Sequence, residues 1–108
     1  MDGLFGSRLR GDILVAVTRL GTTYVSELAR LLRKRPLEIQ RALASLERAG
    51  VIVTRRLGTL RLVELNRRVP EYPELVKLLA KLGERPVYDA LWSQTKRRPR
   101  AIGKTIAV

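Results

Sequence analysis

The sequence contains neither cysteine nor histidine. This excludes thiolate and imidazole metal sites, disulfides, redox switches and catalysis by a Cys or His side chain. A Ser, Asp or Glu nucleophile would also lack an oriented histidine base, and the few acids stand singly along the chain. We therefore expect a protein without enzymatic activity, cofactor or metal ion.

Long apolar runs are also missing. No run approaches the roughly 18 residues that a membrane-spanning helix needs, and the first residues, MDGLFGSRLRGD, lack the apolar core of a signal peptide. No internal repeat or low-complexity block is present. These absences predict a soluble, cytoplasmic protein with no membrane partner; the expectation that it is nucleoid-associated depends on the nucleic-acid partner indicated by the charge described next.

Acidic residues are scarce relative to basic ones. The chain has 22 Lys and Arg against 10 Asp and Glu, a net charge of +12 and a pI near 11.4. The excess is uneven, because residues 33–68 hold 10 of the cations and only 3 of the acids, and the last 26 residues form a second basic segment. This distribution indicates a polyanionic partner such as nucleic acid.

Two helices are predicted in the first third of the chain. Ser7 is a suitable N-cap and Gly21 a suitable end for a helix over about 8–20, whose apolar positions keep helical spacing. Leu14 and Val15 widen its apolar stripe, so we expect mostly core packing with some subunit interface at Leu14. Residues 22–25 favour a short strand, and a second helix is expected over about 25–32.

A third helix is predicted over about 36–49. Pro36 fits the first helical position, and one stripe must be buried because its members recur at helical spacing: Ile39, Ala42, Leu43, Leu46 and Ala49. The opposite face carries Leu37, Arg41, Ala44 and Arg48. Together with the preceding turn, Arg33-Lys34-Arg35, this face could approach a phosphate backbone, or both could simply be solvated surface.

A β-hairpin is predicted directly after this helix. Its strands, VIVTRR and LRLVEL, meet at a turn in which Gly58 can adopt a positive φ. A period of two places Val51, Val53, Leu60 and Leu62 towards the core, and Thr54, Arg56 and Arg61 outward. The alternative is a purely structural hairpin without nucleic-acid contacts.

Residues 72–82 are expected to form a helix with more large apolar side chains than one small core would bury, which favours a homodimer. We place the predicted helices, the β-hairpin or wing, and the helix over 72–82, which is expected to serve dimerisation, in one domain of residues 1–82. Residues 83–108 form a C-terminal extension, a short helix plus basic tail. The tail segment KRRPR is either a nucleic-acid arm or a solubilising end.

Several of these segments resemble winged helix-turn-helix transcriptional regulators, closest to the ArsR-like branch and more loosely the MarR-like one. The resemblance covers about residues 4–82 and is carried by LFGS with a following Arg, VSELARLL, ALASLERAGVI and VELN. It implies a mainly α fold with a small β-hairpin wing and a C-terminal dimerisation helix. It also implies a third helix in the major groove and a wing on the backbone or in the minor groove.

The predicted function is that of a homodimeric, sequence-specific, double-stranded DNA-binding regulator, most simply a repressor, whose effector, if any, is unknown. The DNA-contacting residues expected are Lys34, Arg35, Leu37, Glu38, Gln40, Arg41, Ser45, Arg48, Arg55, Arg56, Gly58, Thr59 and Arg61. The dimer residues expected are Leu14, Tyr72, Leu75, Leu79 and Trp92. The alternative is a winged-helix module that binds RNA or docks on a larger assembly.

Overall fold

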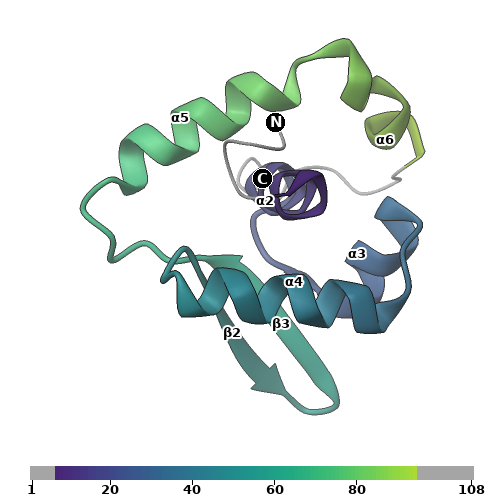
Figure 1. The fold of residues 1–108 in the computed structure, drawn as a ribbon, viewed down its shortest axis with the longest axis vertical. Helices are drawn as coiled ribbons and strands as arrows, with labels where there is room; N and C mark the ends of the chain where they lie inside the picture. Colours follow the sequence, from purple (N-terminus) through teal and green to yellow (C-terminus); the bar gives the residue numbers. More distant parts are fainter. Residues whose placement is uncertain (1–6, 95–108) are drawn as a thin grey trace, which may run out of the picture.

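The computed structural model describes residues 7–94 (Figure 1). Their elements, in chain order, are α2 (Arg8–Leu20), β1 (Thr23–Tyr24), α3 (Val25–Leu32), α4 (Pro36–Arg48), β2 (Ile52–Leu57), β3 (Leu60–Leu65), α5 (Tyr72–Gly83), a 3-10 turn η1 (Pro86–Tyr88) and α6 (Asp89–Gln94). The predicted class, mainly α-helical with a small β-hairpin, is confirmed. The basic segment KRRPR and the residues after it lie outside the described range, as does the beginning of the chain before Ser7.

Helix α2 runs through the centre of the fold, and the other helices and the sheet lie around it (Figure 1). Ser7 caps it as predicted, since its Oγ accepts a hydrogen bond from the Arg10 backbone N–H at 3.1 Å. The residues from Ile13 to Val17 are all buried, so this helix is apolar nearly all round. The assignment of Leu14 to a dimer interface is therefore wrong: its exposed fraction is 0 %, which leaves no surface for a second subunit.

Helices α3 and α4 form the predicted helix-turn-helix. Arg33 ends α3 with a left-handed backbone, φ 58°, and Lys34 donates its N–H to the Ala29 carbonyl at 3.0 Å. Pro36 is the first residue of α4, where its missing N–H costs no hydrogen bond. Glu38 caps the helix, because its Oε1 accepts from the Arg35 backbone N–H at 3.2 Å.

The buried stripe of α4 is close to the prediction. Ile39 and Leu43 are fully buried and Ala42 and Leu46 nearly so, which fixes the helix against the core. Ala49 is the exception: it is exposed, because α4 ends at Arg48 and Ala49 is already its C-cap. Gly50 then turns the chain into β2 with a positive φ of 80°.

Strands β2 and β3 form an antiparallel hairpin, and β1 pairs with the other edge of β3. Leu57 pairs with Leu60, so only Gly58 and Thr59 form the turn. Gly58 has a φ of 63°, the positive value expected for the first turn residue of a type II′ hairpin. This short turn makes the hairpin a projecting wing (Figure 1).

The predicted orientation of the hairpin side chains is wrong by one residue. Ile52, Val63 and Leu65 face the core, whereas Val53 and Leu60 are 37 % and 41 % exposed. A shift of one residue reverses every side chain of a strand. Thr54, Arg56 and Arg61 therefore share the face that continues from the core towards α4, as the following subsections describe.

Helix α5 packs along α2. Leu79, predicted at the dimer interface, is fully buried in the core of the single chain, so that assignment is also wrong; Tyr72 and Leu75 are half-buried and Leu78 is 42 % exposed. The boundary predicted at residue 82 falls within α5, which ends at Gly83.

The residues after α5 pack on the same core. Tyr88 is 3 % exposed, and its hydroxyl donates to Asp12 Oδ1 at 2.7 Å. Trp92, predicted as a dimer anchor, is half-buried within the chain: its Nε1 donates to the Gly83 carbonyl at 2.8 Å and Arg19 lies 4.7 Å from its ring centre. These contacts tie α6 to α2 and α5.

None of the helices within residues 7–94 combines the length and the apolar content needed to cross a membrane. The same residues contain no cluster of three or more acidic side chains that could hold a metal ion.

Candidate nucleic-acid interface

The outward face of α4 is exposed and basic. Arg41 and Arg48 are both exposed, seven residues apart and therefore two helical turns apart on one face. Leu37 lies one turn before Arg41 and is 55 % exposed. The side chain of Ala44 between the arginines is small, so this face can approach a groove closely.

Two of the predicted DNA-contacting residues of α4 have partners within the chain. Ser45 lies on the side of the helix towards α2, where its Oγ accepts from Arg10 Nη1 at 3.3 Å. Glu38 accepts the Arg35 backbone N–H, as described above, which gives its carboxylate a capping role. Ser45 therefore does not belong to the outward face, and the position of Glu38 has a structural explanation besides the predicted DNA contact.

The turn before α4 adds three exposed cations, Arg33, Lys34 and Arg35. The sequence predicted that this whole turn, Arg33 included, could approach a phosphate backbone. Within residues 7–94 none of the three forms an ion pair with an acidic side chain. Their charges are therefore available to a partner at the N-terminal end of α4.

The arginines of the wing divide into two classes. Arg55 pairs with Glu64 across the outer face of the hairpin, with 2.9 Å between Nη2 and Oε2. Arg61 pairs with Glu47 of α4, with 3.0 Å between Nη2 and Oε1. Arg56 has no ion pair with any acid of the described chain. Of the wing arginines predicted to hold phosphates, only Arg56 retains an uncompensated charge.

A groove separates the wing from the beginning of the helix-turn-helix. Its volume is about 410 Å³, and residues of β1, α3, α4 and the wing line it: Tyr24, Val25, Ser26, Pro36, Gln40, Arg56, Thr59, Leu60 and Arg61. Gln40 lies on the side of α4 that faces the wing. Sequence reasoning missed Tyr24 and Ser26, because only the packing of α3 against β3 places the beginning of α3 beside the wing.

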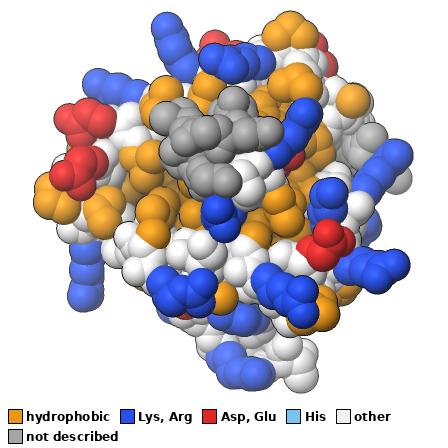
Figure 2. Space-filling model, in the orientation of Figure 1, with side chains coloured by type: hydrophobic (Ala, Val, Ile, Leu, Met, Phe, Trp, Pro, Cys, Tyr) orange, Lys and Arg blue, Asp and Glu red, His pale blue; other side chains and the backbone are white. Residues whose placement is uncertain are grey.

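Seen on the surface, the cations extend over two elements. Figure 2 shows Lys and Arg side chains along α4 and on the hairpin below it, whereas apolar side chains gather between α4 and α5. Eight cations lie between residues 33 and 61, and two of them, Arg55 and Arg61, pair with described acids. The remaining six give this side a strong positive potential.

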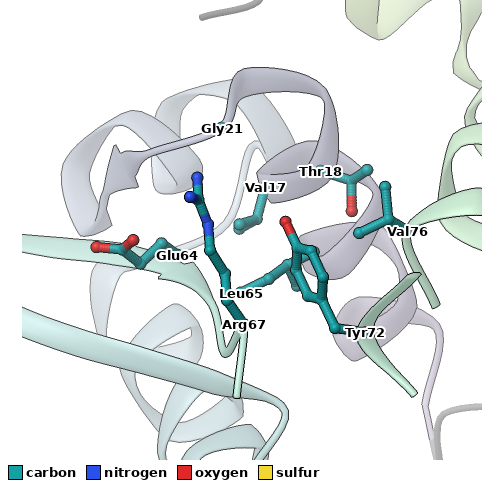
Figure 3. A pocket seen from close by; sticks show the side chains of 8 residues that line it. All are labelled: Val17, Thr18, Gly21, Glu64, Leu65, Arg67, Tyr72 and Val76. Atoms are coloured by element: carbon teal, nitrogen blue, oxygen red, sulfur yellow. The ribbon is translucent and has the colours of Figure 1, made fainter. Parts of the chain in front are cut away.

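A smaller pocket lies between α2, the end of the hairpin and α5 (Figure 3). Val17, Leu65 and Val76 supply its apolar lining, and Arg67 and Tyr72 bring polar ends towards it, whereas Glu64 points away from the other side chains shown. Its volume is about 120 Å³, below the roughly 300–1,000 Å³ typical of pockets that bury a small ligand.

Comparison with known proteins supports the fold. No protein-family model matches the chain, and no curated protein matches it. A solved structure similar to it is that of a double mutant of ZitR from Lactococcus lactis, with a TM-score of 0.58 and 18 % sequence identity. The match covers 69 % of this chain and 51 % of that one, so the chain spans about half the length of ZitR. The likeness supports a winged-helix-like fold for the described chain, mainly helical with a small hairpin wing.

Proposed function

We propose that the protein is a non-catalytic, sequence-specific DNA-binding regulator of transcription, and that it acts as a repressor. Helix α4 enters the major groove, and the wing contacts the backbone or the minor groove. The observation that carries this proposal is one basic surface made by consecutive elements, whose cations lack acidic partners within the described chain: Arg33, Lys34, Arg35, Arg41, Arg48 and Arg56.

Base recognition is assigned to the middle of α4. Arg41 is exposed on the outward face, and an arginine there can donate two hydrogen bonds to the N7 and O6 of guanine. Gln40, exposed on the wing side, has the donor and acceptor that match adenine, and Leu37 can contact a thymine methyl. The cations of the turn and Arg56 hold phosphates, which position the helix without reading sequence.

The regulator is proposed to act as a homodimer. Tyr72 and Leu75 of α5 are half-buried and Leu78 is 42 % exposed, which leaves apolar surface along this helix. A two-fold dimer would present one α4 to each half-site, with the half-sites about 34–36 Å apart. Charged substitutions at Leu75 and Leu78 together should then give a monomer in light scattering, and a persisting dimer would place the interface elsewhere.

Selection from a pool of random duplexes tests this function. The selected duplex is then compared with a scrambled duplex of equal length at about 150 mM salt, where specific sites are bound about 10³-fold or more tightly than non-specific DNA. A two-fold symmetric motif with such a preference supports the proposal. Equal binding to every duplex contradicts it.

Exposed leucines on the same surface favour a second candidate function. Leu37, Leu57 and Leu60 are 55 %, 64 % and 41 % exposed and lie at the start of α4 and at the wing tip. Apolar side chains at these positions would suit docking on a larger protein or RNA assembly. A preference for structured RNA over every duplex in the same assay would support this second function.

A further inference from the structure

An acidic side chain joins the wing to the DNA-facing helix. Glu47, one residue before the end of α4, accepts from Arg61 Nη2 through Oε1 at 3.0 Å and from Thr54 Oγ1 through Oε2 at 2.8 Å. Arg61 Nη2 also lies 3.4 Å from Thr54 Oγ1. Both carboxylate oxygens are therefore used, one towards each strand of the hairpin.

The position of Glu47 on α4 explains this arrangement. It follows Gln40 by seven residues, so the two side chains lie on the same side of the helix, the side that faces the wing. Gln40 lines the open groove, whereas Glu47 closes the space between α4 and the base of the wing. The hydrogen bonds of Glu47 thus hold the C-terminal end of α4 against the wing, whereas a groove separates the two elements at Gln40.

We propose that Glu47 is a positioning residue, which sets the orientation of the wing relative to α4 and thereby the fit of both elements to one duplex. This inference rests on the proposed function. It assigns a different role to Arg61, which was predicted to hold a phosphate: its charge is paired with Glu47 and keeps the wing in place. Arg56 then contacts the phosphate from a wing whose angle is already set.

The contact between Glu47 and the wing is partly exposed. The side chains of Arg61 and Glu47 are 39 % and 34 % exposed, so solvent screens their attraction in part. The second hydrogen bond, from Thr54, makes the carboxylate bidentate and restricts its rotation. At the hairpin base, Ile52 and Leu65 are buried in the core.

Two substitutions of equal charge separate positioning from simple electrostatics. Glu47→Ala breaks the link between α4 and the wing, and alanine is well tolerated in a helix. Glu64→Ala removes the same charge from the opposite face of the hairpin, where its partner Arg55 belongs to the hairpin itself and not to α4. Glu47→Gln keeps one acceptor oxygen for Arg61, and its amide NH₂ can donate to the Thr54 hydroxyl, so it should recover part of the lost function.

Hydrogen exchange on the free protein is the first measurement. In Glu47→Ala the backbone amides of β2 and β3 near the turn should exchange about fivefold faster than in wild type, because a charge-assisted hydrogen bond and a partly exposed ion pair are lost. Thr54→Val should give a smaller increase at unchanged charge, and Glu64→Ala should leave the contacts to α4 intact. Unchanged exchange in Glu47→Ala would overturn the proposal.

Binding to the selected and the scrambled duplex is the second measurement. Glu47→Ala should lower the ratio of the affinity for the selected duplex to that for the scrambled duplex about tenfold. Arg61, freed from its ion pair, can then contact a phosphate, so the scrambled duplex should bind more tightly and the salt dependence of its binding should become steeper by about 0.9 in slope. Glu64→Ala should keep the ratio, and Glu47→Gln should restore part of it. An equal loss of ratio in Glu47→Ala and Glu64→Ala would show that charge alone acts, which overturns the positioning role.

The two proposals fail in different ways. If wild-type protein prefers no duplex, the proposed function is contradicted, but hydrogen exchange still tests whether Glu47 orders the wing. If wild type binds specifically and Glu47→Ala keeps both its wing protection and its affinity ratio, the positioning role alone is overturned.

Discussion

Two neighbouring arginines of the wing should respond differently to the same substitution. Arg56 lines the groove beside α4 and has no ion pair with a described acid. Arg55 faces the other side of β2 and pairs with Glu64, with Nε at 3.1 Å and Nη2 at 2.9 Å from Oε2. Arg56→Ala and Arg55→Ala thus remove equal charges from the same strand, but only the first removes an arginine to which we assign a phosphate contact.

The loss of duplex affinity expected for Arg56→Ala follows from the release of counterions on binding. Each phosphate contact contributes about 0.9 to the slope of log affinity against log salt. Over the tenfold range from about 1 M to 0.1 M salt, a slope change of about 0.9 adds up to roughly an eightfold loss of affinity at the lower salt concentration. This loss equals about 1.2 kcal/mol for each bound subunit. Arg56→Ala should show this loss on selected and scrambled duplexes alike. Arg55→Ala acts only at a distance, where salt screens it over about 10 Å, and should change the slope much less.

Fluorescence anisotropy of a labelled duplex, titrated with protein at several salt concentrations between about 50 and 200 mM, measures both slopes. Thermal unfolding of each variant controls for stability, which we expect to be unchanged because both side chains are exposed. Equal slope changes for the two variants would refute the distinction between a paired and an unpaired arginine. A loss confined to one sequence in Arg56→Ala would refute its assignment to phosphate.

Three further predictions concern α4, the core and the C-terminal segment. Arg41→Ala should lower affinity for the selected duplex by about 1–3 kcal/mol and leave folding intact; an equal loss on scrambled duplex would assign Arg41 to phosphate instead. Leu43→Ala creates a cavity at a fully buried position and should lower the free energy of unfolding by about 2–5 kcal/mol in urea titrations; a change near zero would contradict the core assignment. Burial raises the pKa of Tyr88, and its hydrogen bond to Asp12 acts in the same direction. The folded state therefore holds the Tyr88 proton more tightly than the unfolded chain does. The contribution of this group to the free energy of unfolding is fully present below about pH 10 and is lost as the pH rises above it. Tyr88→Phe should make this decline shallower, and parallel stability curves for wild type and variant would contradict the reasoning.

The order of the elements could be predicted from sequence because local signals mark their ends. Ser7 and Gly21 bracket α2, Pro36 begins α4, and Gly58 supplies the positive φ of the hairpin turn. The orientation of the strands could not be predicted in the same way. Three consecutive β-branched residues, 51–53, carry no alternation, so the packing of β2 against α4 decides that Ile52 faces inward.

Within the candidate interface, only the outward face of α4 could be predicted, because the spacing of residues along one helix determines it. Helical spacing correctly placed Arg41 and Arg48 outward. The pairing of Arg61 with Glu47 joins residues from two elements, and neither spacing nor composition predicts which of several acids will meet a given arginine. The number of apolar residues in 72–82 likewise led to the assignment of Leu79 to a subunit interface. The assignment failed because α2 lies at the centre of the fold, and Leu79 is buried in the core around it.

The central claim is that the outward face of α4 and the wing contact one DNA duplex together. Chemical-shift mapping of the ¹⁵N-labelled protein, titrated with the selected duplex, tests it most directly. The account predicts that the largest shifts fall on the turn before α4, on Gln40, Arg41 and Arg48, and on Arg56 and Gly58 at the wing. Shifts concentrated on α5 and α6, with α4 unaffected, would contradict it.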